Sequence, residues 1–289
     1  MTPVGVLVVD KPQGVTSHQV VGRIRKIFGT RKVGHAGTLD PMATGVLIVG
    51  IGRATRLLGY LALYDKAYTA TIRLGATTTT DDAEGEILET RVADGLDHDA
   101  VEQVMAGLRG AIEQRPSSVS AIKVNGKRAH ALVRAGEQVQ LPPRPVMVSR
   151  FEVTSSRTDA GFLDLDVEVE CSSGTYVRAL ARDLGEQLGV GGHLTSLRRT
   201  RIGGYPVDEA IALDAIEATT TPMTMDQVAR ASFPVCVVND VDADHVRHGR
   251  RLSFEVVADP TGVLSADGEL LGLYRPDNGT SKAVSVLVG

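Results

Sequence analysis

The stretch GHAGTLDPMATGVLIVGIGRATR (residues 34–56) guides the interpretation of the whole chain. It places one acid, Asp40, among small residues, glycines and a proline, and the apolar run VLIVG (46–50) follows directly. The run predicts a buried strand. Asp-Pro commonly begins a turn, and for the dipeptide alone a turn is the simpler interpretation. The glycines, however, allow a ligand to approach the backbone closely. A carboxylate held at a strand end inside a cleft could act as a nucleophile or stabilise a sugar cation.

The segments around this stretch alternate between strand and helix patterns. GVLVVD (5–10) reads as a buried strand. The segment TSHQVVGRIRKIFG (16–29) predicts a helix with a capping box between Thr16 and Gln19 and a stop at Gly29. Further along, period-2 alternation predicts two strands, and helical spacing predicts a short helix, a helix capped by Asp97 and a helix beginning near SSGTYVR. The two strands are KAYTATIRL (66–74) and FLDLDVEVE (162–170). The three helices are RATRLLGYL (53–61), residues 97–109 and residues 174–189.

The pattern changes towards the C-terminus. Residues 206–232 are predicted to be mostly helical, and from Phe233 short β segments follow: FPVCVV, RLSFEVV, GELLGLY and AVSVLVG. They predict a small β-barrel. A length of 289 residues suits one large domain and one small one. We therefore expect an α+β protein with domains at 1–230 and 231–289.

Composition excludes several classes of protein. No run of 18 apolar residues and no signal peptide is present, so neither a membrane protein nor a secreted one is expected. Cys171 and Cys236 lie far apart, which favours the reducing cytoplasm. The histidines lack metal-ligand spacing, and GIGRAT (50–55) departs from the dinucleotide fingerprint at Thr55. No metal and no cofactor is expected.

Charge is segregated along the chain despite a net charge of −4. Residues 1–60 carry eight Lys or Arg and two acids, residues 61–120 carry five bases and eleven acids, and residues 123–150 carry six bases and one acid. The last region, which contains a VNGK hairpin signal, predicts a basic excursion from the body. A polyanion could bind such a surface. Charge alone, however, favours an ordinary solvated surface.

The segment SSGTYVR (172–178) is a second candidate site. Tyr176 and Arg178 would share a face if the segment were extended. Arg178 beside Asp40 would favour the ionised carboxylate. The alternative is a strand end that runs into a helix, with Tyr176 in the core and Arg178 on the surface. On a similarly simple interpretation, Tyr68 would be an aromatic residue in the core of a sheet and His35 a histidine in a loop.

Taken together, these motifs closely resemble bacterial tRNA pseudouridine synthases of the TruB type. The resemblance rests on GVLVVDKPQGVTS, GHAGTLDPMATGVLIVGIGRATR, DKAYTATIRLG and CSSGTYVRALARDLGEQLG, in the order of the family, over roughly residues 4–205. It implies a catalytic domain with a mixed, largely antiparallel sheet flanked by helices. It also implies a thumb-like insertion at about 115–145 that grips the tRNA T-arm, and a PUA-like RNA-binding barrel at the C-terminus. Met42 stands where leucine is more usual.

The resemblance also implies roles for individual residues. Asp40 matches the catalytic aspartate, Tyr68 the tyrosine stacked on the target base, and Arg178 the arginine that pairs with the aspartate. Four further positions match residues that contact the nucleotide or support the fold. Tyr176 matches the tyrosine that lines the uridine pocket, Leu197 a leucine against the nucleotide, His35 the histidine that fills the vacated space in the RNA, and Lys11-Pro12 a structural pair near the first strand.

The implied activity is isomerisation of uridine 55 in the T-loop of tRNA, by base flipping and exchange of the C1′–N1 bond for a C1′–C5 bond. No cofactor, no membrane and no obligate protein partner is implied, and a cytoplasmic monomer is expected. Two alternatives stand beside this interpretation. A noncatalytic RNA-binding or folding factor would not need a lone acid facing a polyanion, and a small-molecule glycosidase would need paired carboxylates.

Overall fold

The computed structural model describes residues 3–117, 123–124, 127–128 and 141–288. Much of the thumb-like insertion predicted at about 115–145 therefore lies outside the described residues. The chain divides into two units, which are described separately. Unit 1 comprises Met1–Pro41, Gly45–Ala62 and Gly203–Gly289, and unit 2 comprises Met42–Thr44 and Leu63–Ile202.

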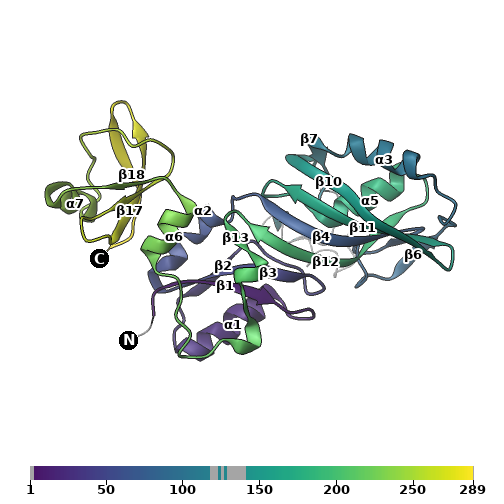
Figure 1. The fold of residues 1–289 in the computed structure, drawn as a ribbon, viewed down its shortest axis with the longest axis horizontal. Coiled ribbons are helices and arrows are strands. Elements are labelled where there is room, and N and C mark those ends of the chain that lie inside the picture. Colours follow the sequence, from purple (N-terminus) through teal and green to yellow (C-terminus); the bar gives the residue numbers. More distant parts are fainter. Residues whose placement is uncertain (1–2, 118–122, 125–126, 129–140, 289) are drawn as a thin grey trace. The chain divides into compact units, whose positions relative to one another are not determined.

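Unit 1 contains a sheet built on the first predicted strand (Figure 1). The strand β1 (Gly5–Lys11) pairs antiparallel with β3 (Thr44–Ile51) and parallel with β14 (Ile211–Ala212). The short strand β2 (Val33–Ala36) pairs antiparallel with β3. This sheet is therefore mixed, as predicted, and the Asp40 stretch connects two strands that pair with each other.

Helix α1 (Ser17–Phe28) covers this sheet and confirms the predicted capping signals. Thr16 and Gln19 form a capping box, and Gly29 ends the helix in the left-handed conformation at φ 62°. The apolar face of the helix packs against residues of β1 and β3 in one hydrophobic cluster, which includes Val20, Val21, Ile24, Phe28, Leu7, Val9, Leu47 and Val49. This packing gives the Asp40 stretch a rigid base.

The segment between Gly203 and Phe233 differs from its prediction. It is not mostly helical, because only α6 (Met225–Ser232) is an α-helix. The other elements are short 3-10 turns and two-residue strands: β13 (Tyr205–Pro206), Val207–Glu209, β14 and Leu213–Ala215. Residues 216–224 lie outside any helix or strand. The short helix predicted near residues 53–61 is present as a 3-10 turn (Gly52–Arg56) and α2 (Leu58–Leu61).

The C-terminal segment forms a small four-stranded sheet in the order β15-β16-β17-β18. RLSFEVV, predicted as a strand, is not one, although Leu252 and Val256 are buried. A small sheet is confirmed, whereas the PUA-like barrel and the boundary near residue 230 stay predictions. The elements are β15 (Val235–Val237), α7 (Asp240–Arg247), β16 (Thr261–Leu264), β17 (Leu270–Asp277) and β18 (Thr280–Val286).

Unit 2 contains an antiparallel sheet in the order β12-β4-β11-β10-β7. Helices α3 and α5 contact each other and the sheet (Figure 1). Asp97 caps α3, as predicted. The elements are β4 (Lys66–Leu74), α3 (His98–Gly107), β7 (Gly110–Gln114), β10 (Arg144–Asp159), β11 (Phe162–Cys171), α5 (Val177–Gln187) and β12 (Gly192–Ile202).

Two small hairpins complete the described part of unit 2. The strands β5 (Ala76–Thr78) and β6 (Ile87–Thr90) pair with each other, and so do β8 (Lys123–Val124) and β9 (Lys127–Arg128). The second pairing confirms the hairpin signal of VNGK. Both units combine sheets and helices, and the α+β class is confirmed.

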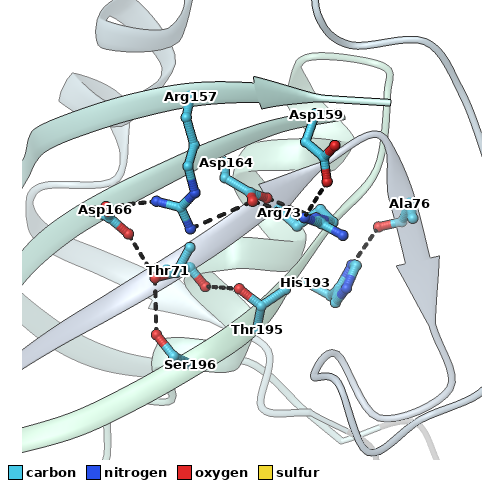
Figure 2. A network of polar contacts seen from close by, with 10 residues as sticks. All are labelled: Thr71, Arg73, Ala76, Arg157, Asp159, Asp164, Asp166, His193, Thr195 and Ser196. Carbon is cyan, nitrogen blue, oxygen red and sulfur yellow. Dashed lines mark hydrogen bonds and ion pairs between the residues drawn. The ribbon is translucent and has the colours of Figure 1, made fainter. Parts of the chain in front are cut away.

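The faces of the unit 2 sheet differ in chemistry, as the alternation in β4 and β11 predicts. On β11, Leu163, Leu165, Val167 and Val169 are at most 4% exposed. The other face carries ion pairs between neighbouring strands (Figure 2). Asp164 of β11 accepts two hydrogen bonds from Arg73 of β4, at 2.7 and 2.8 Å, and these residues are direct partners in the strand register. The face of the sheet opposite the apolar core therefore carries polar contacts between strands.

Candidate active site

The Asp40 loop lies between β2 and β3 and is held on both sides of the aspartate, which itself belongs to unit 1. Gly37 (φ 75°) and Gly45 (φ 97°) have the left-handed conformation that glycine tolerates best. Before Asp40, the hydroxyl of Ser17 accepts a hydrogen bond from the backbone amide of Leu39 at 2.9 Å and donates one to the Leu39 carbonyl at 3.1 Å. Asp40 itself is half-buried. The carboxylate is therefore presented by a tightly held loop.

Lys11 supports the same loop after the aspartate. Its ammonium is fully buried and donates to the backbone carbonyls of Pro12 (2.9 Å), Val15 (2.7 Å) and Pro41 (3.3 Å). The backbone amide of Gly14 donates to the same Pro41 carbonyl at 2.8 Å. Buried charges need such partners. These contacts agree with a structural role for the Lys11-Pro12 pair, and Pro12 is exposed apart from its carbonyl contact.

His35 lies on β2, five residues before Asp40, and is half-buried. The simpler interpretation of the sequence placed His35 in a loop, and its position on a strand corrects that prediction. Its ring meets the ring of His18 edge-on, with centroids 5.5 Å apart and an interplanar angle of 78°. His18 is the second residue of α1. The two histidines and the Asp40 loop are thus supported by the same helix start.

Tyr68 and Leu197 lie on adjacent strands of unit 2. Tyr68 of β4 is 7% exposed and Leu197 of β12 is 8% exposed. Leu197 pairs with Ala70, which is two residues from Tyr68. Because side chains two apart on a strand point to the same face, Tyr68 and Leu197 share one face of the sheet. The structure therefore brings these two predicted site residues together.

Tyr176 and Arg178 lie at the start of α5, so the extended segment that would put them on one face is not formed. Tyr176 is the N-cap residue, and Arg178 is the second residue of the helix. The side chain of Gln114 makes two hydrogen bonds to the Tyr176 backbone. Gln114 Nε2 donates to the Tyr176 carbonyl at 3.1 Å, and Gln114 Oε1 accepts from the Tyr176 backbone amide at 2.8 Å. The two residues remain neighbours at one helix terminus.

Arg178 is 4% exposed, so the surface position that the simpler interpretation gave it is wrong. Its guanidinium donates to the carbonyl of Thr80 at 2.8 Å and lies 3.5 Å from the carboxylate of Asp82. Asp82 is 2% exposed. Asp82 was not among the residues that the sequence singled out. The signal available was the pattern TTTTDD, whose hydroxyls and carboxylates commonly fold back on a turn backbone.

The loop around Asp82 is organised by its own side chains. The Asp82 carboxylate accepts hydrogen bonds from the Thr80 hydroxyl at 2.5 Å and from the Glu84 amide at 3.0 Å. The Thr78 hydroxyl donates to the Asp82 carbonyl at 2.8 Å. Asp81 adopts φ 60° and pairs with Arg182 at 3.4 Å. Arg178 is therefore held by a prearranged turn.

The predicted site residues divide between the units. Asp40, His35, Lys11 and Pro12 belong to unit 1, and Tyr68, Tyr176, Arg178 and Leu197 to unit 2. Within the described ranges, no three His, Cys, Asp or Glu side chains are grouped so that they could hold a metal ion. None of the helices in the described part of the chain is both long and apolar enough to cross a membrane.

Known proteins resemble this chain over nearly its whole length. The model of the TruB family pseudouridylate synthase N-terminal domain matches residues 25–177, and that of the tRNA pseudouridylate synthase B C-terminal domain matches residues 178–233. Two relatives are each named tRNA pseudouridine synthase B. The one from Cutibacterium acnes is 60% identical, covering 98% of each chain, and the one from Thermobifida fusca is 54% identical, covering 99% of each.

Solved structures give the same answer for the fold. One chain of a Cbf5-Nop10-Gar1 complex is 28% identical with a TM-score of 0.71, covering 98% of this chain and 83% of that one. One chain of an H/ACA ribonucleoprotein bound to a substrate RNA is 26% identical with a TM-score of 0.70, covering 99% of this chain and 85% of that one. By family model, sequence identity and fold, this chain belongs to the TruB family of pseudouridylate synthases.

Proposed function

We propose that this chain isomerises uridine to pseudouridine at position 55 in the T-loop of tRNA. The observation that carries the proposal is the 60% identity, over nearly the full length of both chains, with a protein named tRNA pseudouridine synthase B. The Asp40 loop agrees with that chemistry, because its backbone is fastened at Leu39 and Pro41. A fastened loop can present one carboxylate in a fixed place, as positional catalysis requires.

In the proposed reaction, the bond between ribose C1′ and uracil N1 breaks, the base turns, and C5 bonds to the same carbon. C5 then loses its proton and N1 gains one, so the product is an isomer and no redox partner is consumed. Asp40 supplies the anion, either by adding to the sugar or the base or by removing a sugar proton. Arg178 matches the arginine that pairs with this aspartate in the family. Tyr68 helps the C5 proton to leave, directly or through water.

The target base must leave the RNA stack before it reacts. Flipping costs a few kcal/mol, and stacking on an aromatic ring such as Tyr68 returns about 1–3 kcal/mol. In the proposal, Tyr176 and Leu197 line the uridine pocket, and His35 fills the space that the base leaves. The basic residues of 1–60 and 123–150 meet phosphates, so binding weakens steeply as salt rises.

The remaining assignments belong to the same proposal. Residues 1–230 form the catalytic domain, with the thumb-like insertion at about 115–145, and residues 231–289 form a PUA-like RNA-binding domain. The chain acts on the tRNA T-arm as a cytoplasmic monomer without an obligate protein partner.

The test compares Asp40→Asn with the wild type on a T-arm hairpin labelled with tritium at uridine C5. Loss of the carboxylate charge should lower tritium release by at least about 10²–10⁴-fold, the usual contribution of a positioned acid or base. Hairpin affinity and folding should be unchanged. Asp214→Asn, which removes an exposed acid of unit 1, is the matched control and should react at the wild-type rate. Full turnover by Asp40→Asn would refute the assignment, and a wild type that binds but never reacts would indicate a noncatalytic RNA-binding factor.

A further inference from the structure

The backbone of Leu39 depends on one side chain. Leu39 precedes Asp40 in the loop between β2 and β3, where no strand pairing is available to its amide and carbonyl. The Ser17 hydroxyl binds both groups, accepting from the amide at 2.9 Å and donating to the carbonyl at 3.1 Å. Ser17 is 1% exposed and Leu39 is 4% exposed. Buried backbone groups that lose their partners are costly, so this hydroxyl determines where Leu39 lies.

The position of Ser17 is itself fixed by the core. It is the first residue of α1, next to the capping box of Thr16 and Gln19. One turn further along, the apolar face of α1 enters the same hydrophobic cluster as β1 and β3. The hydroxyl therefore links the residue before Asp40 to the helix that packs into the hydrophobic core of unit 1.

A hydroxyl is the side-chain group that this position requires. It provides one donor and an acceptor at a single atom, which matches the amide and carbonyl of a single residue. Alanine would satisfy neither group. With Lys11 and the Gly14 amide on the Pro41 carbonyl, the chain is fixed one residue before Asp40 and one residue after it. Loss of the Ser17 contact would release the first of these anchors and leave the second in place.

We infer that Ser17 is a positioning residue for the reaction, which sets the direction of the Asp40 carboxylate by holding both backbone groups of Leu39. The inference rests on the proposed function for its catalytic consequence. Ser17 acts through Leu39 and does not touch the reacting atoms. Its loss should therefore lower the rate of the chemical step and leave the affinity for RNA unchanged.

The experiment compares Ser17→Ala with Thr16→Ala in the full-length protein. Thr16 caps the same helix, where its hydroxyl accepts a hydrogen bond from the Gln19 amide, so its loss weakens the helix start and leaves the Ser17 hydroxyl in place. Single-turnover tritium release, hairpin affinity and thermal stability are measured for both. Ser17→Ala should react at least about tenfold more slowly than the wild type, because small misplacements of reacting groups cost up to about 10²-fold. Its affinity should be unchanged, and Thr16→Ala should match the wild-type rate.

A second measurement does not depend on activity. Hydrogen exchange of the Leu39 amide should be slow in the wild type and in Thr16→Ala, and fast in Ser17→Ala. Where Ser17→Ala is too unstable to assay, Ser17→Cys replaces it under the same criteria, because a thiol is only a weak donor and acceptor.

Each outcome has a defined meaning. A Ser17→Ala protein that reacts at the wild-type rate, or a Thr16→Ala protein that slows equally, overturns the inference. A wild type that makes no pseudouridine refutes the proposed function instead. In that case, a Leu39 amide that exchanges as slowly in Ser17→Ala as in the wild type would still show that Ser17 does not hold Leu39, which overturns the inference.

Discussion

Arg178 and Asp82 form a buried ion pair, with the guanidinium Nη1 3.5 Å from Oδ2 of the carboxylate and side-chain exposures of 4% and 3%. The two residues are almost a hundred positions apart in sequence, at the start of α5 and in the turn after β5. Charges buried this deeply are stable only when paired and hydrogen-bonded. The orientation of Arg178 therefore depends on Asp82 and on the Thr80 carbonyl.

Asp82→Asn tests this dependence by removing the charge while keeping an oxygen for the Thr80 hydroxyl and the Glu84 amide. Because this removes one partner of a buried ion pair, the free energy of unfolding should fall by about 3–5 kcal/mol. Turnover should fall too, because Arg178 loses a partner that orients its guanidinium. Urea unfolding and tritium release measure the two effects.

The control for this change is the neighbouring Asp81→Asn. It removes a less buried pair with Arg182, and asparagine tolerates the φ of 60° at this position. Its cost should be about 1 kcal/mol or less. Equal losses for Asp81→Asn and Asp82→Asn would contradict the special role of the buried pair.

The sequence predicted the elements whose signals are local. Thr16, Gln19 and Gly29 mark the ends of α1, and the alternation predicts β4 at its observed bounds and β11 to within one residue. The candidate residues at positions 40 and 68 were found because neighbouring motifs are distinctive. Where signals were local and strong, structure followed from sequence.

Local helix breakers and tertiary contacts account for the predictions that were wrong. Residues 206–232 contain short helix-like stretches, but Pro206, Pro222 and the β-branched run at 219–221 stop them from joining into longer helices. RLSFEVV buries Leu252 and Val256 through a bent chain, and Leu252 meets Ser281 in only an isolated bridge. Asp82 was missed because its partner, Arg178, is distant in sequence. The pattern TTTTDD indicates a turn held by its own side chains, but it does not identify the distant partner.

Asp164→Asn tests the polar face of the unit 2 sheet (Figure 2). Asp164 is 4% exposed at its side chain and holds Arg73 through two hydrogen bonds, with Arg157 3.5 Å away. The pKa of Arg73 is raised, chiefly by the hydrogen bond to Asp164. Losing this charged acceptor should lower the free energy of unfolding by about 1.5–3 kcal/mol, the usual contribution of hydrogen bonds to charged groups.

Asp159→Asn is the matched control, because Asp159 also pairs with Arg73 but is 70% exposed and 3.7 Å away. Solvent-exposed pairs contribute little, so its unfolding curve should overlay that of the wild type. Denaturant unfolding at neutral pH compares the three proteins. Should both variants lose the same stability, burial would not be what makes the Asp164 contact strong.

Lys66 and Cys171 are opposite each other on β4 and β11 and titrate in opposing directions. Burial, together with nearby Arg199, lowers the pKa of Lys66 from 10.5 to about 8. Burial raises the pKa of the Cys171 thiol from 9.0 to about 11. Between pH 8 and 10.5 the unfolded chain holds a proton at Lys66 that the folded chain lacks, so this residue makes stability rise with pH. Between pH 9 and 11 the folded chain retains the Cys171 proton, so this residue makes stability fall.

Single substitutions should separate the opposite effects of Lys66 and Cys171 on the pH dependence of stability, which largely cancel in the wild type. Relative to the wild type, Lys66→Met should be most stable near pH 7 and lose that advantage as pH rises through 8 to 10.5, by at most about 1.4 kcal/mol per pH unit. Cys171→Ala should instead gain on the wild type between pH 9 and 11. Urea unfolding at half-unit steps of pH measures both differences, and Lys282→Met, an exposed lysine, should show no such slope. If the Lys66→Met and wild-type profiles ran parallel across this range, burial would not control the titration of Lys66.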